Sequence, residues 1–350
     1  MPAILEADNL VKTYGNHVAV DGVSFAVEEG EVFGLLGPNG AGKTTTISML
    51  TGVLEPTSGT ARIGGHDILA EATEVKRING LVPQDLALYP TLSARANLQF
   101  FGRIYGLRGK VLRERVDDVL EIVALADRAD EAIEKYSGGM KRRVNIAAGL
   151  VHQPRLLFLD EPTVGVDPQS RNHIFESVQR LNRDRRMSII YTSHYMEEVE
   201  LLCNRVAIVD QGRIIALDTI RNLIAMLGGG VIQIGLGQCD EEMLATIRAL
   251  PAVVSAVLVA SPTPAARPDD GTSAGQPAAG GTASAAPAAA PETPPAGPVL
   301  VKIETKRSQD ALVQVIGYLN ERDLAFTSVE IFEPNLESVF LHLTGKKLRE

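Results

Sequence analysis

The chain has 350 residues and a formal net charge of −9, from 34 lysines and arginines against 43 aspartates and glutamates. This length suits about two domains, and the acidic balance argues against the basic surface that nucleic-acid binding requires. Cys203 and Cys239 lack the spacing of metal ligands, so we expect no zinc site and free thiols in a reducing compartment.

We expect neither a signal peptide nor a membrane span. Residues 1–6 contain an early acid and lack both a basic and an apolar region. No apolar run reaches the roughly 18 residues that a spanning helix needs. If the protein works at a membrane, other chains must supply the span.

Residues 3–36 alternate apolar and polar positions, with turn signals at Tyr14-Gly15-Asn16 and at 28–30. This pattern predicts a small antiparallel sheet that leads into a buried strand. Tyr14 is an aromatic residue of the kind that stacks on a base, although a packing or turn tyrosine fits the same position.

A glycine-rich segment follows that strand and precedes a helix-like stretch at 46–50. It reads Gly37-Pro38-Asn39-Gly40-Ala41-Gly42-Lys43-Thr44-Thr45 and fits G-x-x-x-x-G-K-[ST]. Its glycines allow backbone N–H groups to converge on an anion, and the start of the helix adds a positive dipole end. We predict a triphosphate cradle in which Lys43 reaches the β- and γ-phosphates and Thr44 ligates Mg²⁺.

Another strand-like run ends near Gln84, whose amide oxygen can ligate a metal or a water, although a solvated glutamine fits as well. Apolar residues then recur at helical spacing from about 93 to 125, which predicts a helical subdomain at about 86–150. Within it, Ser137-Gly138-Gly139 opens a helix and offers free N–H groups to an anion, or is a plain helix cap. We expect the basic run 141–143 to be a solvated face.

Two further apolar runs end in polar residues. The run at 156–159 is typical of a buried parallel strand and is followed by Asp160 and Glu161. Acids at this edge of an α/β sheet lie where ligands bind, so we predict that Asp160 holds Mg²⁺ through water and that Glu161 polarises the attacking water. The run at 187–193 ends at His194, which either contacts the γ-phosphate or caps the next helix.

Together these residues resemble the ATP-binding subunit of ABC transporters over about residues 3–227. The resemblance implies an α/β P-loop NTPase domain with an antiparallel β subdomain and a helical insert, and ATP and Mg²⁺ as cofactors. It assigns the Walker A loop to 37–45, the Q-loop to Gln84, the signature to Ser137, Gly138 and Gly139, the Walker B acids to Asp160 and Glu161, the D-loop to Asp167, the switch histidine to His194 and adenine stacking to Tyr14.

Tyr136, Met140 and the loop 163–168 are similar to the exporter branch whose membrane subunits are of the ABC-2 type, as in daunorubicin resistance. Met140 replaces the commonest glutamine of the signature, while its serine and glycines remain. The resemblance implies a homodimer in which each ATP lies between one subunit's phosphate loop and the signature and Asp167 of the other. It also implies ABC-2 type permease partners and a peripheral, cytoplasmic position on the inner face of the cell membrane, with docking candidates Leu86, Leu88, Tyr89 and Leu92.

We expect an ATP-binding domain at 1–227 and a small accessory domain built from 231–260 and 299–350. The accessory segments read β-α-β-β-α-β, the ferredoxin-like pattern, and 261–298 between them has the Pro/Ala/Gly-rich composition of a disordered linker. The closing stretch 332–345 either helps to hold two subunits together or regulates them, as the resemblance implies, or packs on its own accessory domain.

The function that we expect is ATP hydrolysis that powers export of a drug, lipid or related cargo through separate membrane subunits. The main alternative is a soluble ABC-type ATPase with no transported substrate. A purely regulatory nucleotide-binding module is disfavoured because Glu161 is present.

Overall fold

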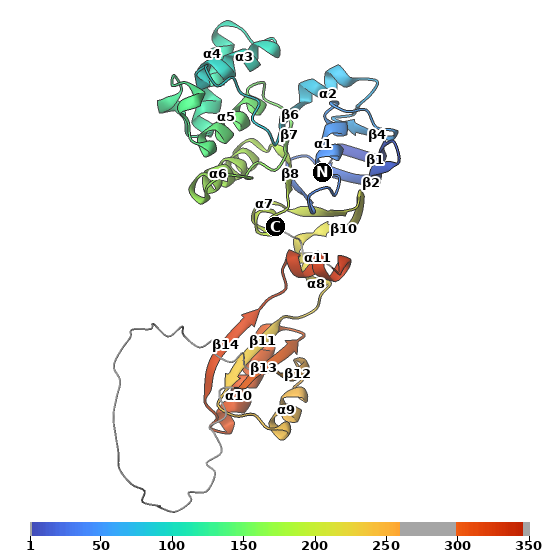
Figure 1. Ribbon diagram of the computed structural model, residues 1–350, viewed down its shortest axis with the longest axis vertical. Helices are drawn as coiled ribbons and strands as arrows, with labels where there is room; N and C mark the ends of the chain where they lie inside the picture. Colours follow the sequence, from blue (N-terminus) through green and yellow to red (C-terminus); the bar gives the residue numbers. More distant parts are fainter. Residues whose placement is uncertain (1, 260–298, 346–350) are drawn as a thin grey trace, which may run out of the picture. The chain divides into compact units, whose positions relative to one another are not determined.

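The structure is a computed structural model that describes residues 2–259 and 299–345. The chain divides into two compact units, one formed by Met1–Leu227 with Asn335–Glu350 and the other by Gly228–Pro334 (Figure 1). The stretch that we expect to be a linker, 261–298, lies outside the described residues.

The first unit contains an antiparallel sheet with the strand order β2-β1-β4-β5. Its strands are β1 (Ala3–Tyr14), β2 (His17–Glu28), β4 (Ser58–Ile63) and β5 (His66–Asp67). The sequence predicts a small antiparallel sheet here, and β4 joins β1 and β2 by pairing with β1.

The second sheet of this unit has the order β10-β9-β3-β8-β7-β6 and is parallel except for β10. Its strands are β3 (Val32–Leu36), β6 (Asn79–Val82), β7 (Leu156–Leu159), β8 (Ser188–Ser193), β9 (Arg205–Asp210) and β10 (Arg213–Thr219). The central strands are apolar on both faces because both faces are covered. In β3, Phe33 and Leu35 enter the core next to the antiparallel sheet, whereas Val32 and Leu36 enter the core next to the helices.

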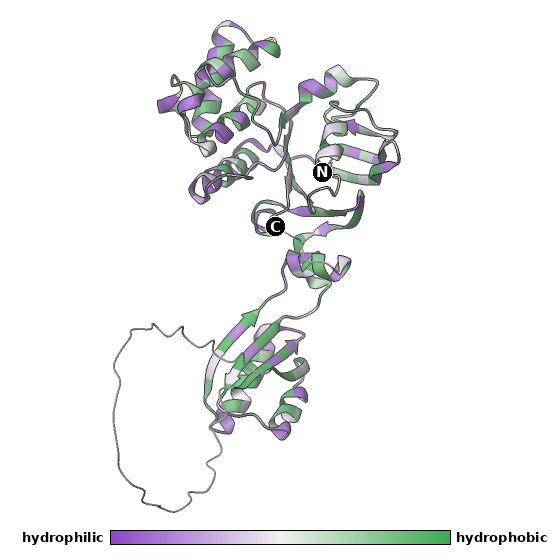
Figure 2. Ribbon diagram, viewed as in Figure 1, coloured by the Kyte–Doolittle hydropathy of each residue, from purple (hydrophilic) through white to green (hydrophobic). Residues whose placement is uncertain are grey.

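Two groups of helices can be distinguished in the first unit (Figure 1). α1 and α2 lie with the antiparallel sheet, whereas α3, α4 and α5 form the predicted helical subdomain. The bounds are α1 (Lys43–Leu50), α2 (Ala72–Ile78), α3 (Ala94–Ile104), α4 (Gly109–Ile122), α5 (Gly138–Leu150), α6 (Pro168–Arg185), α7 (Met196–Leu202) and α8 (Ile220–Ala225), with 3₁₀ turns at Ala126–Arg128 and Ile133–Lys135. α6 is rich in hydrophilic residues (Figure 2). Only a narrow apolar stripe of this helix faces the core, and it includes Ile174, Val178 and Leu181.

The second unit has the β-α-β-β-α-β order that the sequence predicts. Its antiparallel sheet runs β12-β13-β11-β14, and the helices α9 and α10 cover one face with a core of their own. The elements are β11 (Val231–Leu236), α9 (Glu241–Arg248), β12 (Val253–Val259), β13 (Val299–Thr305), α10 (Ser308–Glu321) and β14 (Phe326–Phe332).

The last helix, α11 (Leu336–Thr344), differs from the expectation that 299–350 belongs wholly to the accessory domain. Leu336, Val339 and Phe340 are buried in the core of the first unit, where α11 packs on α7 and α8. The backbone N–H of Leu336 also donates to Glu200 Oε1 of α7 at 2.6 Å. Apolar residues at this spacing form a stripe along the helix, but a stripe does not specify the surface that covers it.

Across residues 2–259 and 299–345, the helices are too short or too polar for any one of them to cross a bilayer.

Candidate active site

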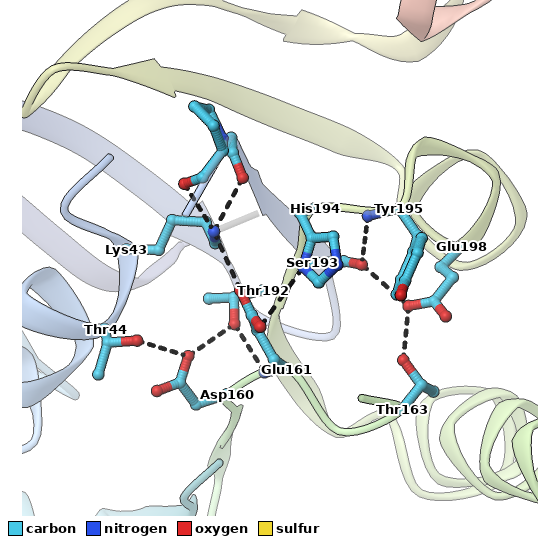
Figure 3. A network of polar contacts seen from close by, with 12 residues as sticks. Lys43, Thr44, Asp160, Glu161, Thr163, Thr192, Ser193, His194, Tyr195 and Glu198 are labelled. Carbon is cyan, nitrogen blue, oxygen red and sulfur yellow. Dashed lines mark hydrogen bonds and ion pairs between the residues drawn. The ribbon is translucent and has the colours of Figure 1, made fainter. Parts of the chain in front are cut away.

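Loops with the predicted site residues follow neighbouring strands of the central sheet. In the order β3, β8, β7 and β6, these strands lead into the glycine-rich loop, His194, the acids Asp160 and Glu161, and Gln84. Parallel neighbours end at the same edge of a sheet, so residues far apart in sequence meet there. Figure 3 shows Lys43, Asp160, Glu161 and His194 together at this edge.

The glycine-rich loop curls around the Lys43 side chain. Lys43 Nζ donates to the carbonyl oxygens of Gly37 at 2.8 Å and Pro38 at 3.1 Å, and the side chain is buried. Gly42 has φ of 100°, and a Cβ there would lie 2.5 Å from the Ala19 carbonyl oxygen, so only glycine fits. The N-cap of α1 is Gly42, which has no side chain to bond the free N–H groups of the first turn, so these groups are available to an anion.

Glu161 lies between two nitrogen atoms. Its Oε1 is 3.0 Å from Lys43 Nζ and its Oε2 is 3.4 Å from His194 Nδ1, with the carboxylate almost fully buried. Glu161 has φ of 44°, in the left-handed region that few residues other than glycine adopt. Such backbone strain is concentrated at functional sites.

Asp160 points to hydroxyl groups rather than to a cation. Its Oδ1 accepts from Thr192 Oγ1 at 2.8 Å and from Thr44 Oγ1 at 3.3 Å. Burial raises the pKa of the Asp160 carboxyl above its ordinary value, and the hydrogen bonds from the two threonines act in the opposite direction. Thr192 Oγ1 also accepts from the Glu161 N–H at 2.9 Å, so one side chain of β8 holds both acids. Thr192 is not among the site residues predicted from the sequence, although it lies only two residues before His194.

Arg142 corrects the expectation that the run 141–143 is a solvated face. Its guanidinium is buried and donates from all three nitrogens to the carbonyl oxygens of Pro83, Gln84, Asp160, Glu161 and Pro162, at 2.7–2.9 Å. Burial lowers the pKa of Arg142, while the nearby carboxylate of Asp160 acts against this. Arg142 therefore ties α5 to the loops after β6 and β7.

The signature and D-loop candidates cap two helices that touch each other. Ser137 Oγ accepts from the N–H of Met140 at the start of α5, and Asp167 Oδ1 accepts from the N–H of Ser170 at the start of α6. A Cβ on Gly139 would lie 2.0 Å from Ser170 Oγ, so the two helix starts are in close contact. The side-chain hydrogen bonds of Ser137 and Asp167 go to α5 and α6, and the structure does not bring these residues to the phosphate loop.

Tyr14 and Gln84 remain outside this network of contacts. Tyr14 ends β1 with half of its surface exposed, and Lys12 Nζ lies 5.4 Å from its ring centroid. The Gln84 side chain is exposed, while its carbonyl oxygen is held by Arg142.

A phosphate loop followed by acids and a histidine on adjacent parallel strands defines a P-loop ATPase. A sequence model described as ABC transporter matches residues 20–164. The linearmycin resistance ATP-binding protein LnrL of Bacillus subtilis (strain 168) is 42% identical over 348 residues, covering 99% of this chain and 100% of that protein. The daunorubicin resistance ATP-binding protein DrrA2 of Streptomyces coeruleorubidus is 36% identical over 343 residues, covering 98% and 95%.

Among solved structures, a dimeric ATP-binding cassette in a post-hydrolysis state, bound to ADP and Pi, matches with a TM-score of 0.56. It is 25% identical, and the match covers 61% of this chain and 98% of that one. The chain belongs to the ABC transporter family. It is an ATP-binding ATPase subunit that energises an exporter. The family and the fold class that the sequence predicts are therefore confirmed. The alternative, a soluble ABC-type ATPase with no transported substrate, is not favoured.

Proposed function

We propose that this chain hydrolyses ATP with Mg²⁺ at the edge formed by its phosphate loop, Asp160, Glu161 and His194, and drives an ABC-2 type permease. The observation that carries the proposal is the position of Glu161 between Lys43 and His194. A buried carboxylate next to a phosphate cradle is placed to orient a water for attack on the γ-phosphate and to accept its proton.

The nucleotide would be held by the loop from Gly37 to Thr45. Its N–H groups would surround the phosphates, and Lys43 would exchange its carbonyl partners for β- and γ-phosphate oxygens. Tyr14 would stack on the adenine, which is consistent with its exposed ring. His194 would contact the γ-phosphate while its ring stays next to Glu161.

The oxygen atoms at the site fit Mg²⁺. Thr44 Oγ1 and Asp160 Oδ1 lie 3.3 Å apart, and Gln84 can add an amide oxygen from the loop after β6, the strand next to β7. The described residues contain no cluster of three or more His, Cys, Asp or Glu able to hold a metal, and Mg²⁺ is commonly bound by few protein ligands together with phosphates and water. Bound there, Mg²⁺ would neutralise charge on the phosphates.

A second copy of the chain would complete the site. Ser137, Gly138 and Asp167 have no role in the phosphate loop of their own chain, whereas exposed N–H groups at the start of α5 suit an anion. In a head-to-tail homodimer, these residues would contact the ATP that is bound to the partner's phosphate loop. The dimeric ATP-binding cassette to which the chain is similar supports a dimer.

Membrane subunits would dock beside the Q-loop and the helical subdomain. Leu86, Tyr89 and Leu92 are exposed apolar residues there, and Leu88 is partly buried. The chain would then lie on the cytoplasmic face of the cell membrane. Relatives named for linearmycin and daunorubicin resistance support a drug-like cargo.

Co-purification tests the transport role. The full chain is captured from detergent-solubilised membranes of its own source, and the proteins that accompany it are identified by mass spectrometry while ATP turnover is assayed. We expect a multi-spanning membrane protein and Mg²⁺-dependent turnover that Lys43→Ala abolishes. Soluble partners alone, with turnover intact, would contradict the transport role.

A further inference from the structure

Glu198 of α7 is a buried carboxylate to which the proposed reaction assigns no role. Its side chain is about 3% exposed, and its Oε2 accepts hydrogen bonds from three hydroxyl groups, each at 2.9 Å. Figure 3 shows two of the donors, Thr163 and Ser193. The donors are Thr163 Oγ1, Tyr191 OH and Ser193 Oγ. Burying a carboxylate is costly unless its hydrogen bonds are satisfied, so this convergence of donors is a specific arrangement and not an incidental contact.

The hydroxyl donors come from segments to which we assign different roles in the proposed reaction. Thr163 begins the loop that leads to Asp167, the residue proposed to act on the partner's ATP site. Ser193 directly precedes His194, and its Oγ also accepts from the N–H of Tyr195 at 2.9 Å. The Ser193 carbonyl oxygen accepts from the Gly37 N–H at 3.4 Å, which joins the phosphate loop to the same point.

The second oxygen of Glu198 faces Arg171 of α6. Arg171 Nε lies 3.7 Å from Glu198 Oε1, and its guanidinium carbon lies 5.3 Å from the centroid of the Tyr195 ring. The backbone N–H of Arg171 donates to the carbonyl oxygen of Asp167 at 2.9 Å. The end of the Asp167 loop and both neighbours of His194 are therefore connected through Glu198 and Arg171.

We propose that Glu198 is a positioning residue that makes the Asp167 loop and the His194 segment move as one unit. Through it, a displacement of Asp167 by the partner subunit would be transmitted to the histidine beside Glu161. This inference rests on the proposed dimeric ATPase function. Burial keeps the Tyr191 hydroxyl protonated by raising its pKa, so the third donor anchors Glu198 to β8.

Two pairs of variants test the coupling in the full chain. Glu198→Gln removes the charge, and Glu197→Gln is its control, because Glu197 is the exposed neighbour on the same helix. Thr163→Val removes the hydroxyl donor at nearly constant shape, and Thr163→Ser restores it. For each variant, kcat and KM for ATP are measured together with Tm and the affinity for ATP.

We expect Glu198→Gln and Thr163→Val to lower kcat by about tenfold, since small misplacements of catalytic groups cost this much or more. KM should stay within about twofold of wild type, because the phosphate loop is untouched. Glu197→Gln and Thr163→Ser should retain wild-type kcat. Combined, Thr163→Val and Ser193→Ala should lose less than the product of their separate losses, because both donate to one carboxylate.

A wild-type kcat in both Glu198→Gln and Thr163→Val would overturn the coupling. A loss of ATP affinity in proportion to kcat would also overturn it, because that result indicates a general structural role. The proposed function is judged separately, from turnover by the wild-type chain and its loss in Lys43→Ala. It can therefore stand when the coupling fails.

Discussion

Lys43 Nζ and Glu161 Oε1 form a buried ion pair at 3.0 Å, between a helix start that follows β3 and a loop that follows β7. Two carbonyl oxygens of the glycine-rich loop also contact the ammonium group. Lys43 therefore retains partners when Glu161 changes, whereas the Glu161 carboxylate loses its main counter-charge when Lys43 changes. Variants at the two positions should have different consequences.

Glu161→Gln should lower ATP turnover by about 10²–10⁴-fold, because the amide cannot accept the proton of the attacking water. ATP binding should persist, since the phosphate loop and Lys43 are unchanged, and an ATP-dependent dimer should accumulate. Turnover assays and size-exclusion chromatography with and without ATP measure both effects. Glu197→Gln is the control, and undiminished turnover in Glu161→Gln would show that another group is the base.

Arg142→Met should lower the free energy of unfolding by about 3 kcal/mol, because carbonyl oxygens in the interior lose a charged donor. Arg143→Met is the matched control, since Arg143 lies on the same helix, is only partly buried and donates to two carbonyl oxygens. Urea unfolding of both variants measures the difference. Equal losses in the two variants would mean that the burial of Arg142 contributes little.

Phe340→Ala in α11 should destabilise the first unit by about 3–5 kcal/mol through loss of a buried ring. Hydrogen exchange should become faster in α7 and α8 and remain unchanged in β11 and β13. Leu341→Ala, at a position that is 39% exposed, is the control. Faster exchange confined to β11 and β13 would contradict the packing of α11 on the first unit.

His152 should make stability depend on pH. Burial lowers the pKa of this imidazole, which stacks on Tyr105 at 3.7 Å and contacts the Asn79 carbonyl oxygen through Nε2 at 2.8 Å. The unfolded chain binds the proton at its ordinary pKa of about 6.5. The contribution of neutral His152 is therefore present above that pH and is lost as the pH falls through the lower folded-state pKa.

Urea unfolding at about pH 7.5 and pH 5.5, on either side of the unfolded pKa, checks this contribution. His152→Gln should show a smaller decrease in unfolding free energy between the two pH values than wild type. Identical decreases would mean that His152 does not contribute to the pH dependence.

The residues of the site and their places at the strand ends were predictable because the sequence signals for them are local. A glycine-rich loop needs its glycines within a few residues, and Gly42 is confined to glycine by its own φ and by the Ala19 carbonyl. Asp160, Glu161 and His194 directly follow apolar runs, and parallel strands must end at one edge. The accessory unit was likewise predictable from its alternation of strand and helix patterns.

Partners of individual side chains were not predictable, because they depend on contacts between distant segments. Nothing in the run 141–143 indicates that Arg142 alone turns inward to loops some 20 and 60 residues away. The predicted accessory domain included residues 336–344, whereas Leu336, Val339 and Phe340 are buried in the core of the first unit.

Local sequence thus determined the family, the phosphate loop and the acids at the strand ends, since backbone geometry and periodicity are short-range properties. Tertiary structure decided that Thr192 holds both acids, that Glu198 joins the Asp167 loop to His194, and that α11 packs on α7 and α8. These contacts bury polar or apolar atoms from distant segments together, and the free energy of that burial depends on which surfaces the fold brings into contact.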